Sequence, residues 1–252
     1  MKKVNSDVAY DYIRKRILSG EYPPGYALLT EALSREIGVS RTPVREALHK
    51  LQADWLVNIR ARLGANVKMM DVKEFKEMCD LRLALEGHAA GLAALNHSQA
   101  DLREIEFALE AMREITKRLI SAKEEQSLID ELVREDVRFH IAIMTAAKNE
   151  LIKGEILRLH LVKRIVFGPI NSATGTPIPV AVKSDRDENR RKVMGFHDEI
   201  YGAIARDDAT AAKNAMERHI QDLIEKSLRA MTNASGGLIA RRLTNEELIY
   251  NS

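Results

Sequence analysis

Hydrophobic positions in the first 55 residues recur at helical spacing and mark three helices. The stripes are Ala9, Ile13 and Ile17 in the first helix, Leu33 and Ile37 in the second, and Val44, Leu48 and Leu51 in the third. Hydroxyl side chains stand where these helices should begin, and glycines stand where two of them should end. The expected caps are Ser6, Thr30 and Ser40, and the expected stops are Gly20 and Gly38.

A different pattern follows Trp55. The stretch LVNIRARLGANVKMM alternates loosely between apolar and polar residues and has a glycine near its middle. This pattern predicts a β-hairpin with strands at 56–60 and 65–69. The first 70 residues therefore predict three helices followed by a hairpin, which is the layout of a winged helix-turn-helix.

From residue 71 to about 231 the pattern predicts helices and no convincing strand. The expected ranges are 72–96, 99–121, 126–147, 149–167, 186–206 and 208–230, with Asn96, Ser98, Asn149 and Asp207 as breaks or caps. The stretch 168–185 holds three prolines and predicts a long irregular loop. We therefore expect a mainly α protein with a winged helix-turn-helix domain at 1–70, a bundle of about six helices at 71–231 and a tail at 232–252.

Charge is distributed unevenly along the chain. Residues 1–70 contain 12 Lys and Arg against 7 Asp and Glu, whereas the remainder contains 27 against 30, which favours two separate tasks. Cys79 is the one cysteine, so no internal disulfide can form. No apolar run approaches the roughly 20 residues of a membrane span, and no signal-peptide core follows the N-terminal lysines. These features predict a soluble cytoplasmic protein with no membrane partner.

The third helix is the candidate for reading DNA, because the major groove admits one helix. Its face opposite the buried stripe carries Arg41, Thr42, Arg45 and His49. An arginine can pair with guanine O6 and N7, which is worth about 1–3 kcal/mol of discrimination. In the hairpin, Arg60 and Arg62 come shortly before Gly64, which lets the backbone approach DNA. Pattern alone leaves open a structural module with a solvated basic face.

The run LLTEALSREIGVSRTPVREALHKLQADWLV, followed by LGANV, closely resembles the N-terminal domain of GntR-family bacterial transcription regulators. SRTPVREAL is highly specific to that family. The helical part, with DVRFH and two later histidines, resembles the FCD effector domain of the FadR subgroup. The resemblance implies that Arg41, Thr42, Arg45 and Gly64 contact operator DNA. Two departures are Trp55, where a glycine is usual, and Glu31, where the fatty-acid-responsive member has a DNA-contacting arginine.

A carboxylate and three histidines form the candidate metal site. Asp136 and His140 are four residues apart on one helix and share a face, and His197 and His219 lie on the last two predicted helices. This donor set suits Zn²⁺, Ni²⁺ or Mn²⁺, with Zn²⁺ favoured. The alternative is a set of hydrogen-bonded core or surface groups. The four positions match the FCD metal pattern one by one, although Phe196 stands where an acidic residue often precedes the third ligand.

Arginines are the candidates for binding an acidic effector beside the metal. Arg82 matches an FCD position at which arginine commonly holds the effector, and its guanidinium suits a carboxylate. The alternative to effector binding is that Arg82 forms a surface ion pair with Glu86, four residues later. Arg134 and Arg158 are weaker candidates, each with the alternative of a solvated charge. His160 is a further pocket candidate, with a helix-face or core role as its alternative.

Together these features predict a dimeric, ligand-responsive transcription regulator, most simply a repressor, that binds a palindromic operator and is not an enzyme. A small organic acid bound near the metal would release or modulate it. Two alternatives remain at this point. One is a metal sensor without an organic effector, and the other is a metal-dependent hydrolase fused to a DNA-binding module.

Overall fold

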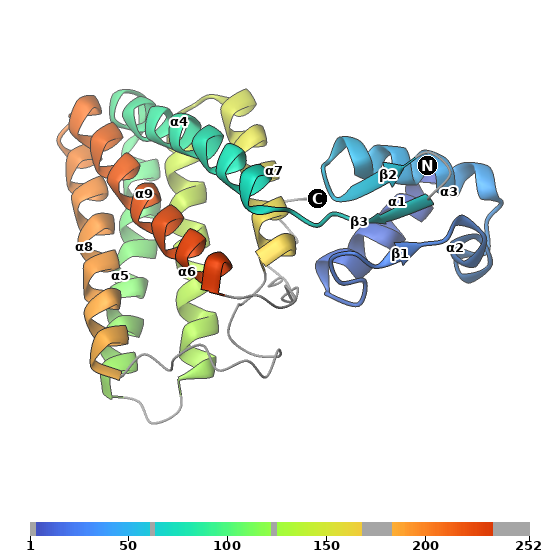
Figure 1. The fold of residues 1–252 in the computed structure, drawn as a ribbon. Helices are drawn as coiled ribbons and strands as arrows, with labels where there is room; N and C mark the ends of the chain where they lie inside the picture. The colour runs from blue at the N-terminus through green and yellow to red at the C-terminus, as the bar shows by residue number, and fades with distance from the viewer. Residues whose placement is uncertain (1–3, 61–63, 122–124, 168–182, 234–252) are drawn as a thin grey trace. The chain divides into compact units, whose positions relative to one another are not determined.

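The computed structural model describes residues 4–60, 64–121, 125–167 and 183–233 (Figure 1). Two compact units divide this part of the chain: one contains the residues up to Lys73 and residues 158–167, and the other contains Glu74–Leu157 together with the two C-terminal helices. The described part is mainly helical, as the sequence predicts. Arg62, nearly all of the predicted 168–185 loop and the tail beyond residue 233 lie outside the described residues.

Three helices and a small sheet make up the N-terminal unit. The helices are α1 (Asn5–Leu18), α2 (Thr30–Ile37) and α3 (Arg41–Ala53), and the strands are β1 (Ala27–Leu28), β2 (Val57–Arg60) and β3 (Gly64–Val67). The strands form an antiparallel sheet in the order β1-β3-β2, with Arg60 opposite Gly64 and Ala27 opposite Asn66. The predicted hairpin is confirmed. Strand β1 is not predicted by the sequence, because a strand of two residues shows no periodic pattern. It forms by pairing with β3, which is distant along the chain.

The buried stripes of α1 and α3 pack against each other and form the core of this unit. Gly38 ends α2 in the left-handed conformation, with φ +77, as expected. The predicted caps are less accurate. Ser6 lies buried inside α1, Thr30 is the first residue of α2, and Ser40 stands at the N-cap of α3 without a side-chain hydrogen bond. Ser6 and Thr30 are wrong as caps because hydroxyl residues also fit the first turn.

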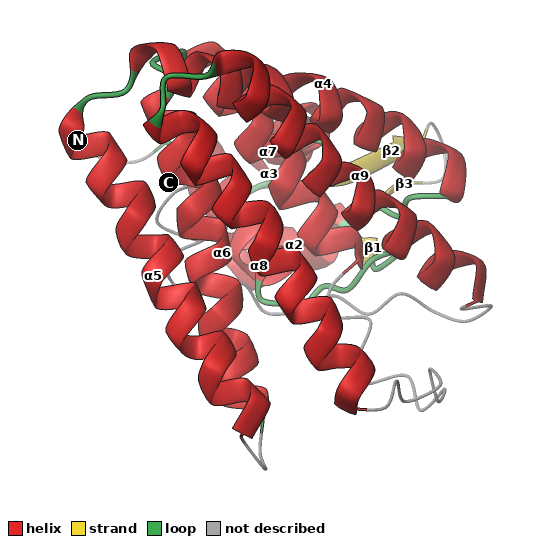
Figure 2. Ribbon diagram, turned by 90° about the vertical axis from the view of Figure 1, so that its left-hand side faces the viewer, coloured by secondary structure: helices red, strands yellow, loops and turns green. Residues whose placement is uncertain are grey.

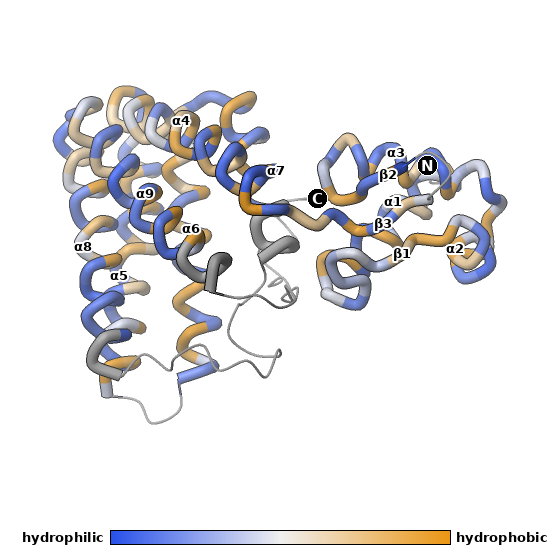
Figure 3. The backbone as a smooth tube through the Cα atoms, in the orientation of Figure 1, coloured by the Kyte–Doolittle hydropathy of each residue, from blue (hydrophilic) through white to orange (hydrophobic). Residues whose placement is uncertain are grey.

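Six helices follow the sheet along the chain, and none of the described helices is long and apolar enough to cross a membrane (Figure 2). They are α4 (Val72–Asn96), α5 (Gln99–Ser121), α6 (Gln126–Ala146), α7 (Glu150–Phe167), α8 (Lys183–Ala205) and α9 (Ala209–Asn233). Helix α5 packs against α6 and α8, and α8 packs against α9. Hydrophobic and hydrophilic residues alternate along the helices (Figure 3), because each turns one side to the bundle core.

Two glycines on α4 allow α9 to approach closely. A Cβ atom at Gly87 would lie 2.7 Å from Cγ of Glu217, and one at Gly91 would lie 3.2 Å from the carbonyl oxygen of Ala209. Glu217 stands two residues before the candidate ligand His219. The close packing of α4 and α9 therefore places the middle of α4 next to the candidate metal site.

Candidate functional site

Helix α3 presents the candidate reading face. Arg41, Thr42, Arg45 and His49 are exposed, whereas the opposite stripe is buried among the other helices of the unit. Proline in the first turn removes an N–H that would have no partner in the helix, and Ser40 is extended at the N-cap. The first-turn N–H groups face the same end as Arg41, so this end of the helix favours anionic groups such as phosphate.

The wing begins at Gly64, which has φ +88. A side chain at this position would be strained because residues with a Cβ atom rarely adopt this conformation. Nothing lies within 4 Å of the position that such a Cβ atom would take. Glycine is thus required by the backbone turn and not by crowding, and the exposed Arg60 lies opposite it in the sheet.

The two departures from the family pattern have visible structural consequences. Trp55 takes a left-handed conformation, with φ +63, where the family usually has a glycine. Glu31, at the start of α2, forms an ion pair with Arg41: Oε1 of Glu31 lies 3.1 Å from Nη2 of Arg41. Both side chains of this pair are largely exposed, so the pair contributes little to stability.

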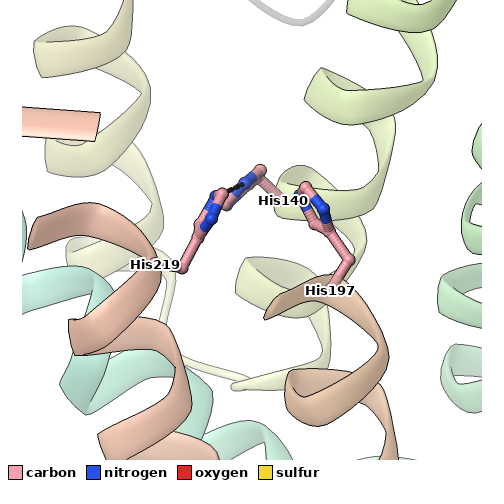
Figure 4. A group of neighbouring side chains, drawn as sticks. All are labelled: His140, His197 and His219. Atoms are coloured by element: carbon pink, nitrogen blue, oxygen red, sulfur yellow. Dashed lines mark hydrogen bonds between the residues drawn. The ribbon is translucent and has the colours of Figure 1, made fainter. Parts of the chain in front are cut away.

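Three buried histidines meet inside the helical unit (Figure 4). His140 comes from α6, His197 from α8 and His219 from α9. One ligand atom from each lies within 4.8 Å of the other two. The Nε2 atoms of His140 and His219 are 3.2 Å apart. Two nitrogens bound to one tetrahedral Zn²⁺ at about 2.0–2.1 Å would lie roughly 3.3–3.4 Å apart. These three residues can therefore hold a divalent metal ion.

The surroundings of His219 and of His197 suit a role as metal ligands. Burial lowers the pKa of His219 to about 2, so its imidazole is neutral near pH 7. Nδ1 of His197 lies 2.9 Å from the carbonyl oxygen of Val193, one turn earlier in α8. A carbonyl oxygen only accepts, so Nδ1 of this ring donates, and Nε2 is the atom that faces Asp136 and the position of an ion.

Asp136 stands one helical turn before His140 and completes the predicted set. Its Oδ1 atom lies 3.2 Å from Nε2 of His197, and 40% of its side chain is exposed. Desolvation by the surrounding protein acts to raise the pKa of this carboxyl, but the polar contact with His197 outweighs it and holds the pKa well below its ordinary value. The carboxylate is thus ionised, as a metal ligand must be.

Aromatic side chains line the histidine cluster. Phe139 is fully buried, and its ring meets the ring of His197 edge-on at 4.9 Å. Phe196, the residue that departs from the FCD pattern, lies with its ring 5.9 Å from that of His219. These rings limit the rotation of the imidazoles, and Phe196 supplies a carbon surface at a position where an acidic side chain is usual.

The candidate effector arginines lie in different surroundings. Arg82 on α4 is fully buried, and its Nε donates to Oε1 of Glu86 at 2.8 Å. The pair named in the alternative exists, but it is buried and not on the surface, because this face of α4 points into the bundle. Arg134 and Arg158 are half-buried on α6 and α7. His160 on α7 is also half-buried.

Glu86 is the residue that sequence reasoning missed. Its Oε2 atom lies 3.6 Å from Nδ1 of His140, so it joins Arg82 to the histidine cluster. The spacing of four residues between Arg82 and Glu86 indicates that the two can pair. The contact of Glu86 with His140 depends on how α4 and α6 pack, which the sequence pattern does not predict.

Two family models cover most of the chain: that of gntR-family bacterial regulatory proteins matches residues 5–67, and that of the FCD domain matches 77–222. The chain is 28% identical over 235 residues to the "Probable D-xylose utilization operon transcriptional repressor" of Paenarthrobacter nicotinovorans, covering 91% of this chain and 90% of that protein. It is 32% identical over 146 residues to the gluconate operon transcriptional repressor of Bacillus subtilis, covering 58% and 56%.

Among solved structures, E. coli McbR/YncC is 19% identical, with a TM-score of 0.63 over 92% of this chain and 100% of that chain, which shows a shared fold. The relatives are transcription regulators, so the hydrolase alternative is not supported. The helix-turn-helix and the FCD domain imply DNA and a small molecule as partners. The FCD match alone spans more than half of the sequence, and the chain therefore belongs to the GntR family of bacterial transcription regulators and carries an FCD domain.

Proposed function

We propose that this protein is a repressor that binds a palindromic operator as a dimer and is released by a small carboxylate-bearing metabolite. The single observation that carries the proposal is the pairing of an exposed basic face on α3 with a buried histidine cluster in the helical unit. The proposal assigns DNA binding to residues 1–70, metal, effector and dimer contacts to 71–231, and a tail to 232–252. Two sites in one chain are what ligand-controlled DNA binding requires.

In this proposal α3 lies in the major groove and the wing contacts the adjacent backbone. Arg45 and Arg41 read base edges, Thr42 and His49 add polar contacts, and Gly64 with Arg62 belongs to the wing. Loss of a bidentate arginine contact costs about 1–3 kcal/mol, or roughly 5- to 150-fold in operator affinity.

The test of DNA reading is fluorescence anisotropy with the operator and with scrambled DNA. Arg45→Ala should lose operator affinity and much of the preference for operator over scrambled sequence. Lys50→Ala is the matched control, because Lys50 lies on the same helix with Nζ 2.7 Å from Asp7 of α1. The removal of Arg45 must reduce the preference for operator and the removal of Lys50 must not; equal effects of the two would refute base reading by Arg45.

Dimer formation is proposed through α4. Its outer face carries Leu81, Leu85, His88, Leu92 and Leu95, with alternating spacings of four and three residues, and Leu81 and Leu95 are exposed. This is the spacing by which helices pack in coiled coils. A second copy of the same helix would bury the leucines, and a two-fold dimer would match the symmetry of a palindromic operator.

We propose that Asp136, His140, His197 and His219 together hold the metal, with Zn²⁺ favoured and Ni²⁺ or Mn²⁺ as alternatives. Imidazole nitrogens together with one carboxylate oxygen fit the preferences of these ions. A bound ion would supply a positive centre with open positions for the carboxylate of an effector. Asp136 is the most accessible of the four residues, so the open side of the site is expected beside it.

The proposed effector is a small organic acid. The gluconate repressor named above is a relative whose name refers to a sugar acid, which agrees with this chemical class. Arg82, Arg134 and Arg158 stay as candidates for holding the acid. The acid can release the operator only if it binds the DNA-incompetent state more tightly than the competent one.

Metal analysis separates this proposal from a metal sensor without an organic effector. Purified protein is stripped with a chelator, and operator binding is measured with Zn²⁺, with gluconate, and with both. We expect release only when both are present, and we expect His197→Ala to bind the operator without responding. Release by Zn²⁺ alone would favour the metal sensor.

A further inference from the structure

A buried ion pair on α4 stands beside the histidine cluster. Arg82 and Glu86 are each only 1% exposed, and Nε of Arg82 lies 2.8 Å from Oε1 of Glu86. Burial of two charges is costly, and a well-packed apolar pair of the same volume is often at least as stable. Stability alone is thus a weak reason for two ions in the core of the bundle.

The second oxygen of this carboxylate faces a candidate ligand. Oε2 of Glu86 lies 3.6 Å from Nδ1 of His140, while Nε2 of the same ring lies 3.2 Å from His219. One edge of the His140 ring thus faces the carboxylate, and the other faces the centre of the cluster. The 3.6 Å distance is an ion-pair contact, slightly longer than a hydrogen bond.

The neighbouring ligand His197 shows how such a ring is oriented. Its Nδ1 contacts the carbonyl oxygen of Val193 at 2.9 Å, within its own helix. For His140 the group facing Nδ1 is instead a side chain from another helix, α4. Metal-binding histidines generally donate their second N–H to a carboxylate or a carbonyl, which fixes the ring and strengthens the ligand.

We propose that Glu86 is a positioning residue for the metal site: held by Arg82, it accepts the Nδ1–H of His140 and keeps Nε2 directed at the ion. This inference rests on the proposed metal site at Asp136, His140, His197 and His219. It gives Arg82 a role in holding Glu86, in addition to the effector contact proposed for it. Removal of the charge on Glu86 then weakens metal binding although Glu86 itself does not touch the ion.

The test measures Zn²⁺ affinity of the full-length protein by competition with a chromophoric chelator. Glu86→Gln should weaken Zn²⁺ binding by about 10- to 100-fold, the usual loss for a partner of a ligand histidine. Glu125→Gln is the matched control. The carboxylate of Glu125 accepts a hydrogen bond from Arg190 at 2.7 Å in the same bundle. The Glu125→Gln variant therefore shows the effect of removing a carboxylate that is paired with an arginine but does not face His140. We expect its Zn²⁺ affinity to equal that of the wild type.

A double-mutant cycle separates positioning from a purely structural role. In a His140→Ala background, Glu86→Gln should cause no further loss of Zn²⁺ affinity, because the residue through which Glu86 acts is absent. If Glu86→Gln leaves too little folded protein, Arg82→Met with Glu86→Gln removes both charges at similar volume and should show the same loss.

The outcomes separate the two proposals. Wild-type affinity in Glu86→Gln, or an equal further loss in the His140→Ala background, overturns the positioning role while the metal site stands. A wild-type protein that takes up no Zn²⁺, Ni²⁺ or Mn²⁺ overturns the metal site and the positioning role with it.

Discussion

Asp101 ties the start of α5 to the end of α6, and its replacement by asparagine should have a pH-dependent cost. Oδ2 of Asp101 accepts from the backbone N–H of Ser98 at 2.8 Å and from Nζ of Lys148 at 2.6 Å. The backbone N–H of Asp101 in turn donates to Oγ of Ser98 at 3.2 Å, which makes a reciprocal cap. Lys148 is the second residue after the end of α6, so one carboxylate joins the ends of two helices.

The magnitude follows from the pKa of this carboxyl. Burial acts to raise the pKa, but the hydrogen bonds from Lys148 and Ser98 outweigh it and lower the pKa from 3.8 to about 2. At 1.36 kcal/mol per pKa unit, the ionised group contributes about 2.4 kcal/mol near pH 7. The side chain is 13% exposed, so solvent screening reduces this value only modestly. Asp101→Asn should therefore cost about 2 kcal/mol.

The sign of the pH dependence is fixed by the lowered pKa. The unfolded chain takes up a proton near pH 3.8 and the folded chain only near pH 2, so stability is present above pH 4 and is lost as the pH falls. At pH 3 the difference between wild type and Asp101→Asn should be about 1.1 kcal/mol smaller than at pH 7.

The assay is urea unfolding of the full-length protein, followed by far-ultraviolet circular dichroism at pH 7 and pH 3. Asp130→Asn is the control, because Asp130 is on α6 and, within the described part of the chain, accepts a side-chain hydrogen bond from Gln126 at 3.1 Å in an exposed position. That variant should lose no more than about 0.5 kcal/mol. An equal loss for the two variants, or a cost of Asp101→Asn that does not shrink at pH 3, would refute the reasoning.

Three further predictions concern the wing, the metal and the dimer. Gly64→Ala should destabilise the protein by about 1 kcal/mol, because residue 64 has a positive φ. Gly154→Ala, in the interior of α7, should stabilise the protein by up to about 1 kcal/mol. A lower melting temperature for Gly154→Ala than for Gly64→Ala would contradict this. Zn²⁺ at 100 times its Kd should raise the free energy of unfolding by about 2.7 kcal/mol in the wild type, and not in His219→Ala; an equal rise in both would exclude His219 from the site. Leu81→Glu with Leu95→Glu should yield monomers in size-exclusion chromatography with light scattering, whereas Glu77→Gln should leave the dimer intact; a dimeric double variant would disprove the α4 interface.

The helices and the reading head could be predicted from local information. Apolar spacing, Pro43 and the stop at Gly38 act within one or two turns, so they predict the three N-terminal helices before any packing is known. The ranges 72–96 and 99–121 agree with α4 and α5, because both helices carry long periodic runs. The caps were less accurate, as Ser6 shows, since hydroxyl residues fit more than one position at a helix start.

The sequence by itself determined the helical character of the chain, the exposed basic face of α3 and the family that the chain resembles. Those features depend on neighbours along the chain. Only the tertiary structure decided that His140, His197 and His219 meet with their ligand atoms within 4.8 Å, that Arg82 and Glu86 are buried instead of exposed, and that Glu86 faces His140. Each of these depends on how helices far apart in sequence pack, and no local pattern of residues specifies that packing.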